Sequence, residues 1–190
     1  TKGYFSNDFS YAIDKSHVHG YNFLEVSDEK EYYQIKTSEV KCKIQKIDMR
    51  LSIFDLEGNV ILEDELGFHW EESYEFGGNI VKMSKSSKDG ECFYGLGDKA
   101  THLNLKGKRV ENFATDQEPL YKVVPFYIGL HNKKSYGIFF DNTFRTYFDF
   151  CYERRNVTSY WAEGGELNYY FIYGREMQEV VTTYTDLTGK

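Results

Sequence analysis

Cysteine and proline are both scarce in this sequence of 190 residues, and each scarcity limits the structure. The three cysteines, Cys42, Cys92 and Cys151, are odd in number and widely spaced, which argues against a disulfide framework or a cysteine zinc site. We therefore expect buried free thiols, and no metal or other cofactor. The two prolines, Pro119 and Pro125, hold the segment between them extended, because proline fixes its own backbone angle and restricts the residue before it.

Basic residues and long apolar runs are lacking as well. Lys and Arg number 23 against 30 Asp and Glu, a net charge of −7, whereas binding nucleic-acid phosphates requires a basic face. No apolar run approaches the ~20 residues of a membrane-spanning helix. We therefore expect neither nucleic acid nor a membrane as a partner. The first ten residues have no signal-peptide pattern, which favours a cytoplasmic location, with export open if a cleaved leader preceded them.

Aromatic residues are abundant, with 17 Tyr and 15 Phe, and such side chains suit the half-buried surfaces of β-strands. Apolar and polar residues alternate along much of the chain, which predicts strands at 21–26, 32–36, 124–130, 136–140, 144–150 and 167–173. Residues 49–62 predict a hairpin that turns at Glu57-Gly58-Asn59. The apolar residues change parity between Ile44 and Ile47, which indicates a bulge or a break between two strands.

One segment has a helical period. Met177, Val180, Val181 and Tyr184 fall on one helical face, and Gly189 is a typical stop, so we predict a short C-terminal helix at 176–186. Residues 84–90 are expected to form an exposed loop. Many short strands followed by one helix predict a mainly β fold, an antiparallel β-sandwich that forms a single domain over residues 1–190.

Two motifs could indicate phosphate or metal binding. Gly95 and Gly97 form a Gly-x-Gly pair, but neither a third glycine nor a Lys-Ser/Thr pair follows, so close backbone packing or a tight bend is the better interpretation. His17 and His19 lie two residues apart, as ligands on a strand would, but no third ligand accompanies them at a suitable spacing. The sequence therefore predicts no metal site.

Two further features could indicate sugar chemistry. An acidic group could supply paired carboxylates, although a solvated turn and hairpin rim is the better interpretation; its members are Glu63, Asp64, Glu65, Glu71 and Glu72. Trp70 could stack on a sugar ring, although a tryptophan on a strand is more often half-buried in the core. Neither feature by itself predicts an active site.

Five short motifs occur in one order: FYGLGDK at 93–99, HLNLKGK at 102–108, NFATD at 112–116, PLYKVVPFY at 119–127 and YGIFFDN at 136–142. In that order they resemble the N-terminal β-sandwich domain of glycoside hydrolase family 31, the α-glucosidase family. Residues 184–189, YTDLTG, are similar to the segment that leads into the catalytic (β/α)8 barrel of that family. The resemblance extends over roughly residues 44–190 and implies a galactose-mutarotase-like supersandwich, with the barrel expected downstream and absent from this chain.

The resemblance also implies where function resides. Two barrel aspartates carry the family's retaining mechanism, so no catalytic residue is expected here. The family's N-terminal domain contributes a rim loop whose aspartate contacts the sugar, and by motif this residue is Asp116. A carboxylate is apt there because it accepts hydrogen bonds from sugar hydroxyls. Only Gln117 and Glu118 separate Asp116 from the proline-leucine-tyrosine run, whereas family members usually have several more residues there. This short spacing leaves open an alternative in which Asp116 is a surface turn residue.

Three functions follow as hypotheses. The first is a non-catalytic N-terminal domain of an α-glucosidase that removes terminal α-linked glucose from oligosaccharides. Such a domain would pack on its own barrel, would be inactive alone, and would expose an apolar interdomain face capable of self-association. The second is a free-standing carbohydrate-binding module. The third is a mutarotase-like epimerase, which needs a general acid and base in a cleft, typically His and Glu, yet no histidine here occupies a motif position of such an enzyme.

Overall fold

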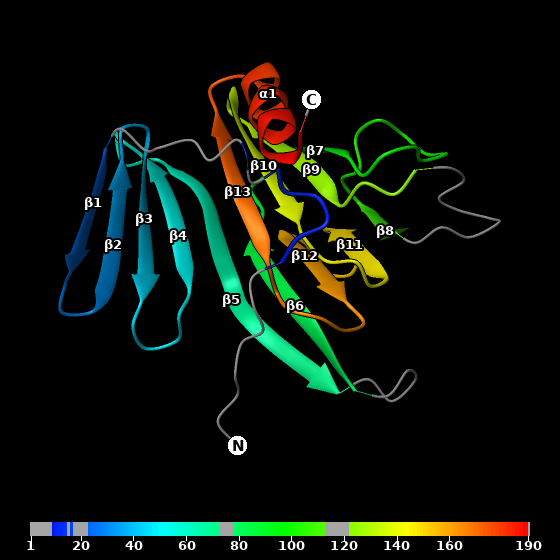
Figure 1. Cartoon of the computed structure of the whole chain (residues 1–190), viewed down its shortest axis with the longest axis horizontal. Coiled ribbons are helices and arrows are strands. Elements are labelled where there is room, and N and C mark those ends of the chain that lie inside the picture. Colours follow the sequence, from blue (N-terminus) through cyan, green and yellow to red (C-terminus); the bar gives the residue numbers. More distant parts are fainter. Residues whose placement is uncertain (1–8, 15, 17–22, 73–77, 113–121, 190) are drawn as a thin grey trace.

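The computed structural model describes residues 9–14, 16, 23–72, 78–112 and 122–189, which form two antiparallel sheets and one helix (Figure 1). The larger sheet has the strand order β1-β2-β3-β4-β5-β6-β12-β11-β8. Its strands are β1 Leu24–Asp28, β2 Tyr32–Thr37, β3 Val40–Gln45, β4 Leu51–Asp55, β5 Val60–Glu72, β6 Asn79–Ser86, β8 Lys108–Asn112, β11 Thr146–Phe150 and β12 Val157–Ala162. The smaller sheet has the order β13-β10-β9-β7, with β7 Cys92–Gly95, β9 Phe126–His131, β10 Lys134–Phe140 and β13 Tyr169–Gly174. The predicted antiparallel sandwich is confirmed.

Several local predictions are confirmed with small shifts of boundary. The helix α1 spans Met177–Thr188 and ends at Gly189, whose φ of 93° is accessible to glycine at little cost. Strands β4 and β5 form the predicted hairpin, with Gly58 at φ 92° in its turn. The change of parity after Ile44 is a break between strands, because β3 ends at Gln45 and β4 begins at Leu51.

The prediction of an exposed loop at 84–90 is wrong in its first part. Ser84 and Lys85 belong to β6 and are buried, with 3% and 1% of their surfaces exposed. The related prediction of a solvated acidic rim is wrong for Asp64, which is also buried. Lys85 Nζ donates to Asp64 Oδ1 at 2.5 Å and to the Tyr169 hydroxyl at 3.1 Å. A bulge in β5 between Asp64 and Gly67 accompanies this inward carboxylate, and removing one partner of such a buried pair typically costs ~3–5 kcal/mol.

The core between the sheets is largely aromatic, and Tyr127 on β9 lies at its centre, fully buried. Its ring contacts five others at centroid distances from 5.1 to 6.5 Å: Phe93, Tyr136, Phe148, Phe150 and Tyr160. Most of these pairs are edge-to-face, an arrangement that adds to the free energy of area burial. The alternating Phe148 and Phe150 of the predicted strand both face inward, as the two-residue period requires.

The helix covers the outer face of the smaller sheet (Figure 1). Val180 is fully buried there, and the Tyr184 ring stacks on Phe126 with centroids 3.9 Å apart. Gly174 permits this approach, because a Cβ at that position would lie 2.6 Å from a Val180 methyl carbon. A second apolar layer therefore closes the side of the smaller sheet that faces away from the larger one.

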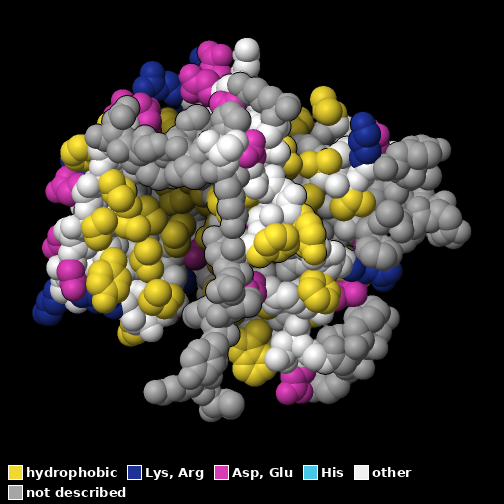
Figure 2. All heavy atoms as spheres, in the orientation of Figure 1, with side chains coloured by type: hydrophobic (Ala, Val, Ile, Leu, Met, Phe, Trp, Pro, Cys, Tyr) yellow, Lys and Arg dark blue, Asp and Glu magenta, His cyan; other side chains and the backbone are white. Residues whose placement is uncertain are grey.

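The smaller sheet covers only part of the larger one, and this leaves an uncovered surface. The inner faces of strands β1–β4 carry apolar side chains, of which Val26 is 64%, Leu24 56% and Tyr33 41% exposed. We call this surface the β1–β4 apolar face; its residues are Leu24, Val26, Tyr33, Ile35, Cys42, Ile44 and Leu51. Figure 2 shows hydrophobic side chains gathered over these strands, at the left of the view. The apolar face continues into the core, against which Cys42 and Leu51 pack.

The three cysteines are free, as predicted, but they are half-buried and not buried. Burial raises the pKa of the Cys42 thiol to about 11, so this thiol stays protonated at neutral pH. Within the described part of the chain, no helix is long and apolar enough to cross a membrane.

The buried tyrosine hydroxyls give a matched test of the core. The Tyr127 hydroxyl has no hydrogen-bond partner among the described residues, whereas the Tyr136 hydroxyl donates to buried Glu91 Oε1 at 2.8 Å. We expect Tyr127→Phe to leave the free energy of unfolding unchanged or higher. Tyr136→Phe should lower it by roughly 1–3 kcal/mol, because a buried acceptor loses its donor. Urea denaturation measures both, and equal losses in the two variants would contradict this description of the core.

Candidate functional site

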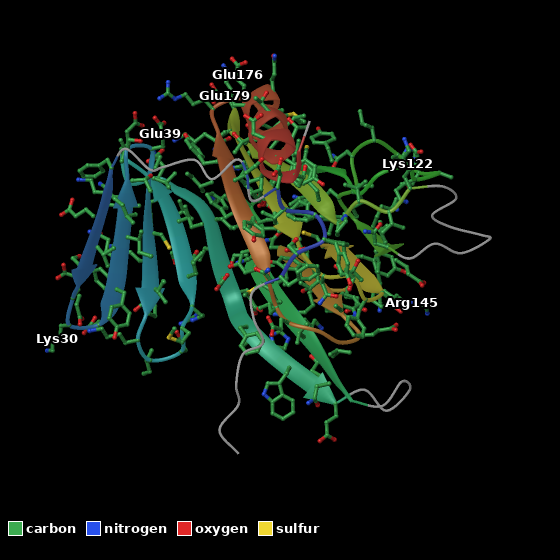
Figure 3. The ribbon with its side chains drawn as sticks, viewed as in Figure 1. Lys30, Glu39, Lys122, Arg145, Glu176 and Glu179 are labelled. Atoms are coloured by element: carbon green, nitrogen blue, oxygen red, sulfur yellow. The ribbon has the colours of Figure 1, made fainter. Side chains whose placement is uncertain are left out.

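The candidate site lies at one end of the sandwich, which we call the loop end. Strand β8 ends there and β9 begins there, and the β10–β11 and β12–β13 connections, residues 141–145 and 163–168, lie at the same end. Figure 3 shows Lys122 and Arg145 on this side of the molecule, remote from Glu39 and Glu176 at the opposite end. Asp116 belongs to the segment 113–121 that joins β8 to β9, and it lies outside the described residues. The site is therefore defined by the residues that frame this segment.

The chain re-enters the fold after this segment through a contact with two glycines. A Cβ on Gly97 would lie 2.6 Å from the Lys122 carbonyl oxygen, and a Cβ on Gly95 would lie 2.6 Å from that of Phe126. Both glycines have positive φ, 78° and 126°. Leu96 between them is fully buried, and its N–H donates to Phe126 O at 2.9 Å. The predicted close backbone packing of the Gly-x-Gly pair is confirmed, and it fixes where the segment rejoins β9.

The segment also leaves the fold at a fixed point. Asn112, the last residue of β8, is 1% exposed, and its Oδ1 accepts a hydrogen bond from Lys99 Nζ at 3.0 Å. The backbone carbonyl of Asn112 accepts from Thr146 Oγ1 at 3.4 Å. The Asn112 Nδ2 has no hydrogen-bond partner within the described ranges. The 113–121 segment thus begins at a buried residue, Asn112, and ends at the close backbone contact between Lys122 and Gly97.

Asn142, from the YGIFFDN motif, joins the two neighbouring connections. Its Nδ2 donates to the carbonyls of Gly164 at 2.9 Å and Glu166 at 3.1 Å, while its Oδ1 accepts from Phe144 N at 2.8 Å. The Phe144 ring lies against Gly164 and Gly165, where a Cβ would come within about 3 Å of the ring. These bonds engage the Asn142 amide, so we assign it a role in shaping the loop end and not in binding a ligand.

A shallow pocket of about 340 Å³ opens beside these connections. Its walls combine exposed aromatic rings, Tyr11 at 84% and Phe144 at 54%, with the polar side chains of Asp141 and Asn168. Asn168 Nδ2 donates to Asp141 Oδ2 at 3.4 Å. Aromatic faces next to carboxylate and amide groups can hold the apolar face and the hydroxyls of a sugar.

Arg145 and two carboxylates near the loop end are engaged with neighbouring side chains. Arg145 Nε lies 3.2 Å from Glu111 Oε1, and the Tyr147 hydroxyl donates to Glu163 Oε1 at 2.6 Å. Burial, together with the Glu163 carboxylate, raises the pKa of Tyr147 to about 12. These carboxylates hold the edge of the larger sheet together, and they do not form the pair of free acids that glycoside hydrolysis needs.

The remaining sequence candidates are placed as follows. Trp70 is 60% exposed on the inner face of β5, and Phe68 on the same face is 54% exposed, so the expected half-buried position of Trp70 is wrong. His17 and His19 lie outside the described residues. The described residues contain no group of three His, Cys, Asp or Glu side chains that could hold a metal ion. Sequence reasoning missed the Asn142 bonds, because they join loops that are more than twenty residues apart.

Comparison with known proteins gives concordant matches. Residues 1–149 match the family described as "Glycosyl hydrolase 31 N-terminal galactose mutarotase-like domain". The chain is 29% identical over 174 residues to Alpha-glucosidase 2 of Bacillus thermoamyloliquefaciens, covering 87% of this chain and 21% of that protein. It is 35% identical over 115 residues to the alpha-xylosidase XylQ of Lactiplantibacillus pentosus, covering 58% of this chain and 15% of that protein.

A solved structure matches as well. A mutant GH31 dextranase of Flavobacterium johnsoniae, solved with isomaltotriose, superposes with a TM-score of 0.84 at 29% identity, over 100% of this chain and 23% of that chain. The chain thus spans about a fifth, or less, of the length of these relatives.

Gly97 and Gly58, which have similar φ values, provide a test of the backbone contact between Gly97 and Lys122. Gly97→Ala and Gly58→Ala both place a side chain at positive φ, which costs roughly 1–2 kcal/mol. Only at Gly97 would the new Cβ also meet a backbone oxygen, because no atom lies within 4 Å of the Gly58 position. We expect Gly97→Ala to lower the free energy of unfolding by a further ~1–3 kcal/mol in urea denaturation. Equal losses would show that the backbone contact has no energetic role.

Proposed function

The chain belongs to the family of glycosyl hydrolase 31 N-terminal galactose mutarotase-like domains, and we propose that it is the non-catalytic N-terminal domain of an α-glucosidase. In this proposal, residues 1–190 act as one domain, and the whole protein removes terminal α-linked glucose from oligosaccharides. Support comes from the similarity to Alpha-glucosidase 2 and to the dextranase solved with isomaltotriose. The family membership predicted from the five motifs is confirmed.

The chemistry of retaining glycosidases indicates which domain of the whole protein would carry the catalytic residues. Two carboxylates flank the scissile bond, one as nucleophile and one as general acid and base. We place both in the catalytic barrel of the whole protein, so the 190-residue chain alone should not hydrolyse α-glucosides. The observation that carries the proposal is the structure of the loop end, where buried Asn112 and the close contact of Lys122 with Gly97 hold the two ends of the 113–121 segment.

The proposal also specifies the substrate as an α-glucoside. The relatives include an alpha-xylosidase as well as an alpha-glucosidase, and a xyloside differs from a glucoside only by lacking the hydroxymethyl group. Initial rates of the whole protein on nitrophenyl α-glucoside, nitrophenyl α-xyloside and isomaltotriose test it. The proposal expects the glucosides to be preferred, whereas a preference for the xyloside would make the protein an α-xylosidase.

We propose that Asp116 contacts the sugar from the rim of the active site. In the whole protein, Asp116→Ala should lower kcat/KM by about ten- to a hundredfold, because a hydrogen bond to a charged group is worth ~1.5–3 kcal/mol. The melting temperature should barely change, since a rim segment contributes little to core packing. Asp89→Ala, in the exposed β6–β7 turn, is the control and should leave both quantities unchanged. Unchanged kinetics in Asp116→Ala would make this residue a turn residue, and a large fall in melting temperature would make it structural.

The β1–β4 apolar face suits the role of a domain within a larger protein. A surface with Val26, Leu24 and Tyr33 between 41% and 64% exposed is unusual for a domain that functions alone. We propose that the catalytic barrel of the same protein covers this face. Support comes from its continuity with the sandwich core and from the small share of each relative that this chain spans.

The isolated chain should therefore self-associate through the uncovered face. Sedimentation velocity at rising concentration should show dimers or larger species, and Val26→Lys should shift the population to monomers, because the new charge would be desolvated in the contact. Gln34→Lys adds the same charge on the opposite face of the neighbouring strand and should not do so. A monomer at high concentration, or equal effects of both variants, would contradict a role for this face.

A further inference from the structure

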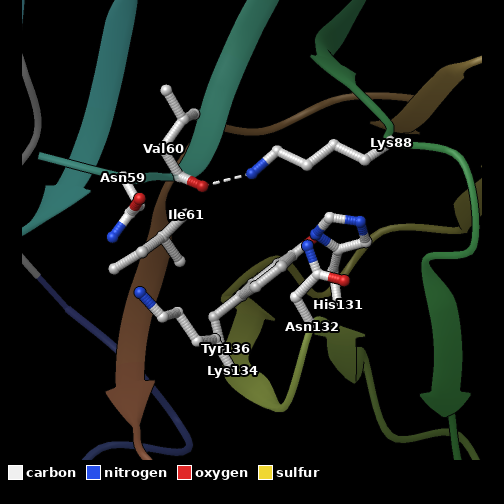
Figure 4. Close-up of a pocket in the computed structure, with 8 residues that line it drawn as sticks. All are labelled: Asn59, Val60, Ile61, Lys88, His131, Asn132, Lys134 and Tyr136. Atoms are coloured by element: carbon white, nitrogen blue, oxygen red, sulfur yellow. Dashed lines mark hydrogen bonds between the residues drawn. The ribbon is translucent and has the colours of Figure 1, made fainter.

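A second pocket, of about 480 Å³, lies at the end of the sandwich opposite the loop end. Three connections that are distant in sequence meet there: the β4–β5 turn, the β6–β7 loop and the β9–β10 hairpin. Figure 4 shows Asn59, Lys88, His131, Asn132, Lys134 and Tyr136 around this space. None of these residues takes part in the proposed function.

Lys88 is the distinctive residue of this pocket. Its side chain extends across the pocket, and its ammonium donates to the backbone carbonyl of Val60, a neutral acceptor (Figure 4). None of the ion pairs formed among the described residues includes Lys88, although Lys134 beside it pairs with Asp55. Burial lowers the pKa of the Lys88 ammonium, and this effect outweighs the opposing effect of the Glu91 and Glu63 carboxylates. A lysine has three donors, so part of its hydrogen-bonding capacity remains available to a ligand.

Two of the acidic groups near Lys88, Glu91 and Asp55, are already engaged, and a third, Glu63, is exposed and forms no ion pair with Lys88. Glu91 is 2% exposed; its Oε1 accepts from the Tyr136 hydroxyl, and its Oε2 accepts from Ser87 Oγ at 2.8 Å and from Lys88 N at 2.9 Å. Asp55 accepts from the Asn59 side chain at 2.8 Å as well as from Lys134. Neither carboxylate is placed to neutralise the Lys88 ammonium directly.

The β9–β10 hairpin presents further polar groups to the same space. Asn132 and Lys133 have φ values of 49° and 62°, as both central residues of a tight two-residue hairpin turn require. This turn places His131 and Asn132 along the pocket wall, while Lys133 is exposed and does not line it. Ring and amide N–H groups are donors that suit an oxyanion, and the buried Tyr136 and Ile61 supply an apolar floor.

We propose that this pocket binds a small oxyanion, the carboxylate or phosphate group of a small molecule, with the Lys88 ammonium as its main partner. His131 and Asn132 would supply additional donors, whereas the Asn59 amide already donates to Asp55 and Glu57. The proposal is independent of the α-glucosidase assignment, because the pocket lies at the other end of the sandwich from the segment 113–121. It assigns a second binding site to the domain.

An NMR titration of the 190-residue chain tests the proposal. Sodium phosphate, and separately sodium acetate, is added at constant ionic strength, and backbone amide shifts are followed. We expect saturable shifts at Lys88, His131 and Asn132 with at least one of these anions, and the anion that saturates identifies the ligand as phosphate or carboxylate. Linear shifts with both anions, or saturation with maltose alone, would overturn the proposal.

Matched variants separate the site from general charge effects. Lys88→Gln should weaken anion affinity at least tenfold, whereas Lys133→Gln removes the same charge from the exposed turn and should leave affinity unchanged. A dispersed amide spectrum shows that each variant is folded. If Lys88→Gln does not fold, Asn132→Gly removes one donor, keeps a residue that accepts positive φ, and should weaken affinity severalfold. Equal affinities in wild type and in the folded pocket variant would refute the site.

Discussion

The close approach of Gly95 and Gly97 to the chain that enters β9 is the contact on which the rest of the structure depends. Side-chain atoms at these two positions would meet the carbonyl oxygens of Lys122 and Phe126. The same approach brings a Cβ on Gly95 within 3.0 Å of the Tyr127 Cα, so the glycines also set the depth of the residue at the centre of the aromatic core. One backbone contact thus connects the core to the segment 113–121. This explains why two motifs of the sequence, about twenty residues apart, form one structural unit.

Regular alternation and one helical period were enough to predict the class of fold and most strand positions. The incorrect predictions have two physical causes. The predicted loop at 84–90 overlaps the end of strand β6. Ser84 and Lys85 there are polar, yet both are buried. Lys85 is neutralised by Asp64, 21 residues earlier, and no local pattern reports that the two side chains meet. The prediction that Trp70 is half-buried was wrong for a different reason. The two-residue period shows which face of a strand a side chain lies on, but not how far the covering sheet extends over that face.

The two candidate sites differ in how much the sequence could reveal. Asp116 was identified only by resemblance to a family. The structure adds the contacts of buried Asn112 and of Lys122, which hold the two ends of its segment. The pocket around Lys88 had no sequence signal at all. Its residues come from three turns, each of which is ordinary by itself, and only the packing of the two sheets brings them together.

We propose that the loop end of this domain faces the sugar while the β1–β4 apolar face packs on the catalytic barrel. A crystal structure of the whole protein with a bound α-glucoside oligosaccharide tests this claim most directly. The account predicts a sugar ring against the segment 113–121, with the Asp116 carboxylate within hydrogen-bond distance of its hydroxyls, and Val26 buried against the barrel. A sugar bound far from this segment, together with a loop end that faces solvent, would contradict it.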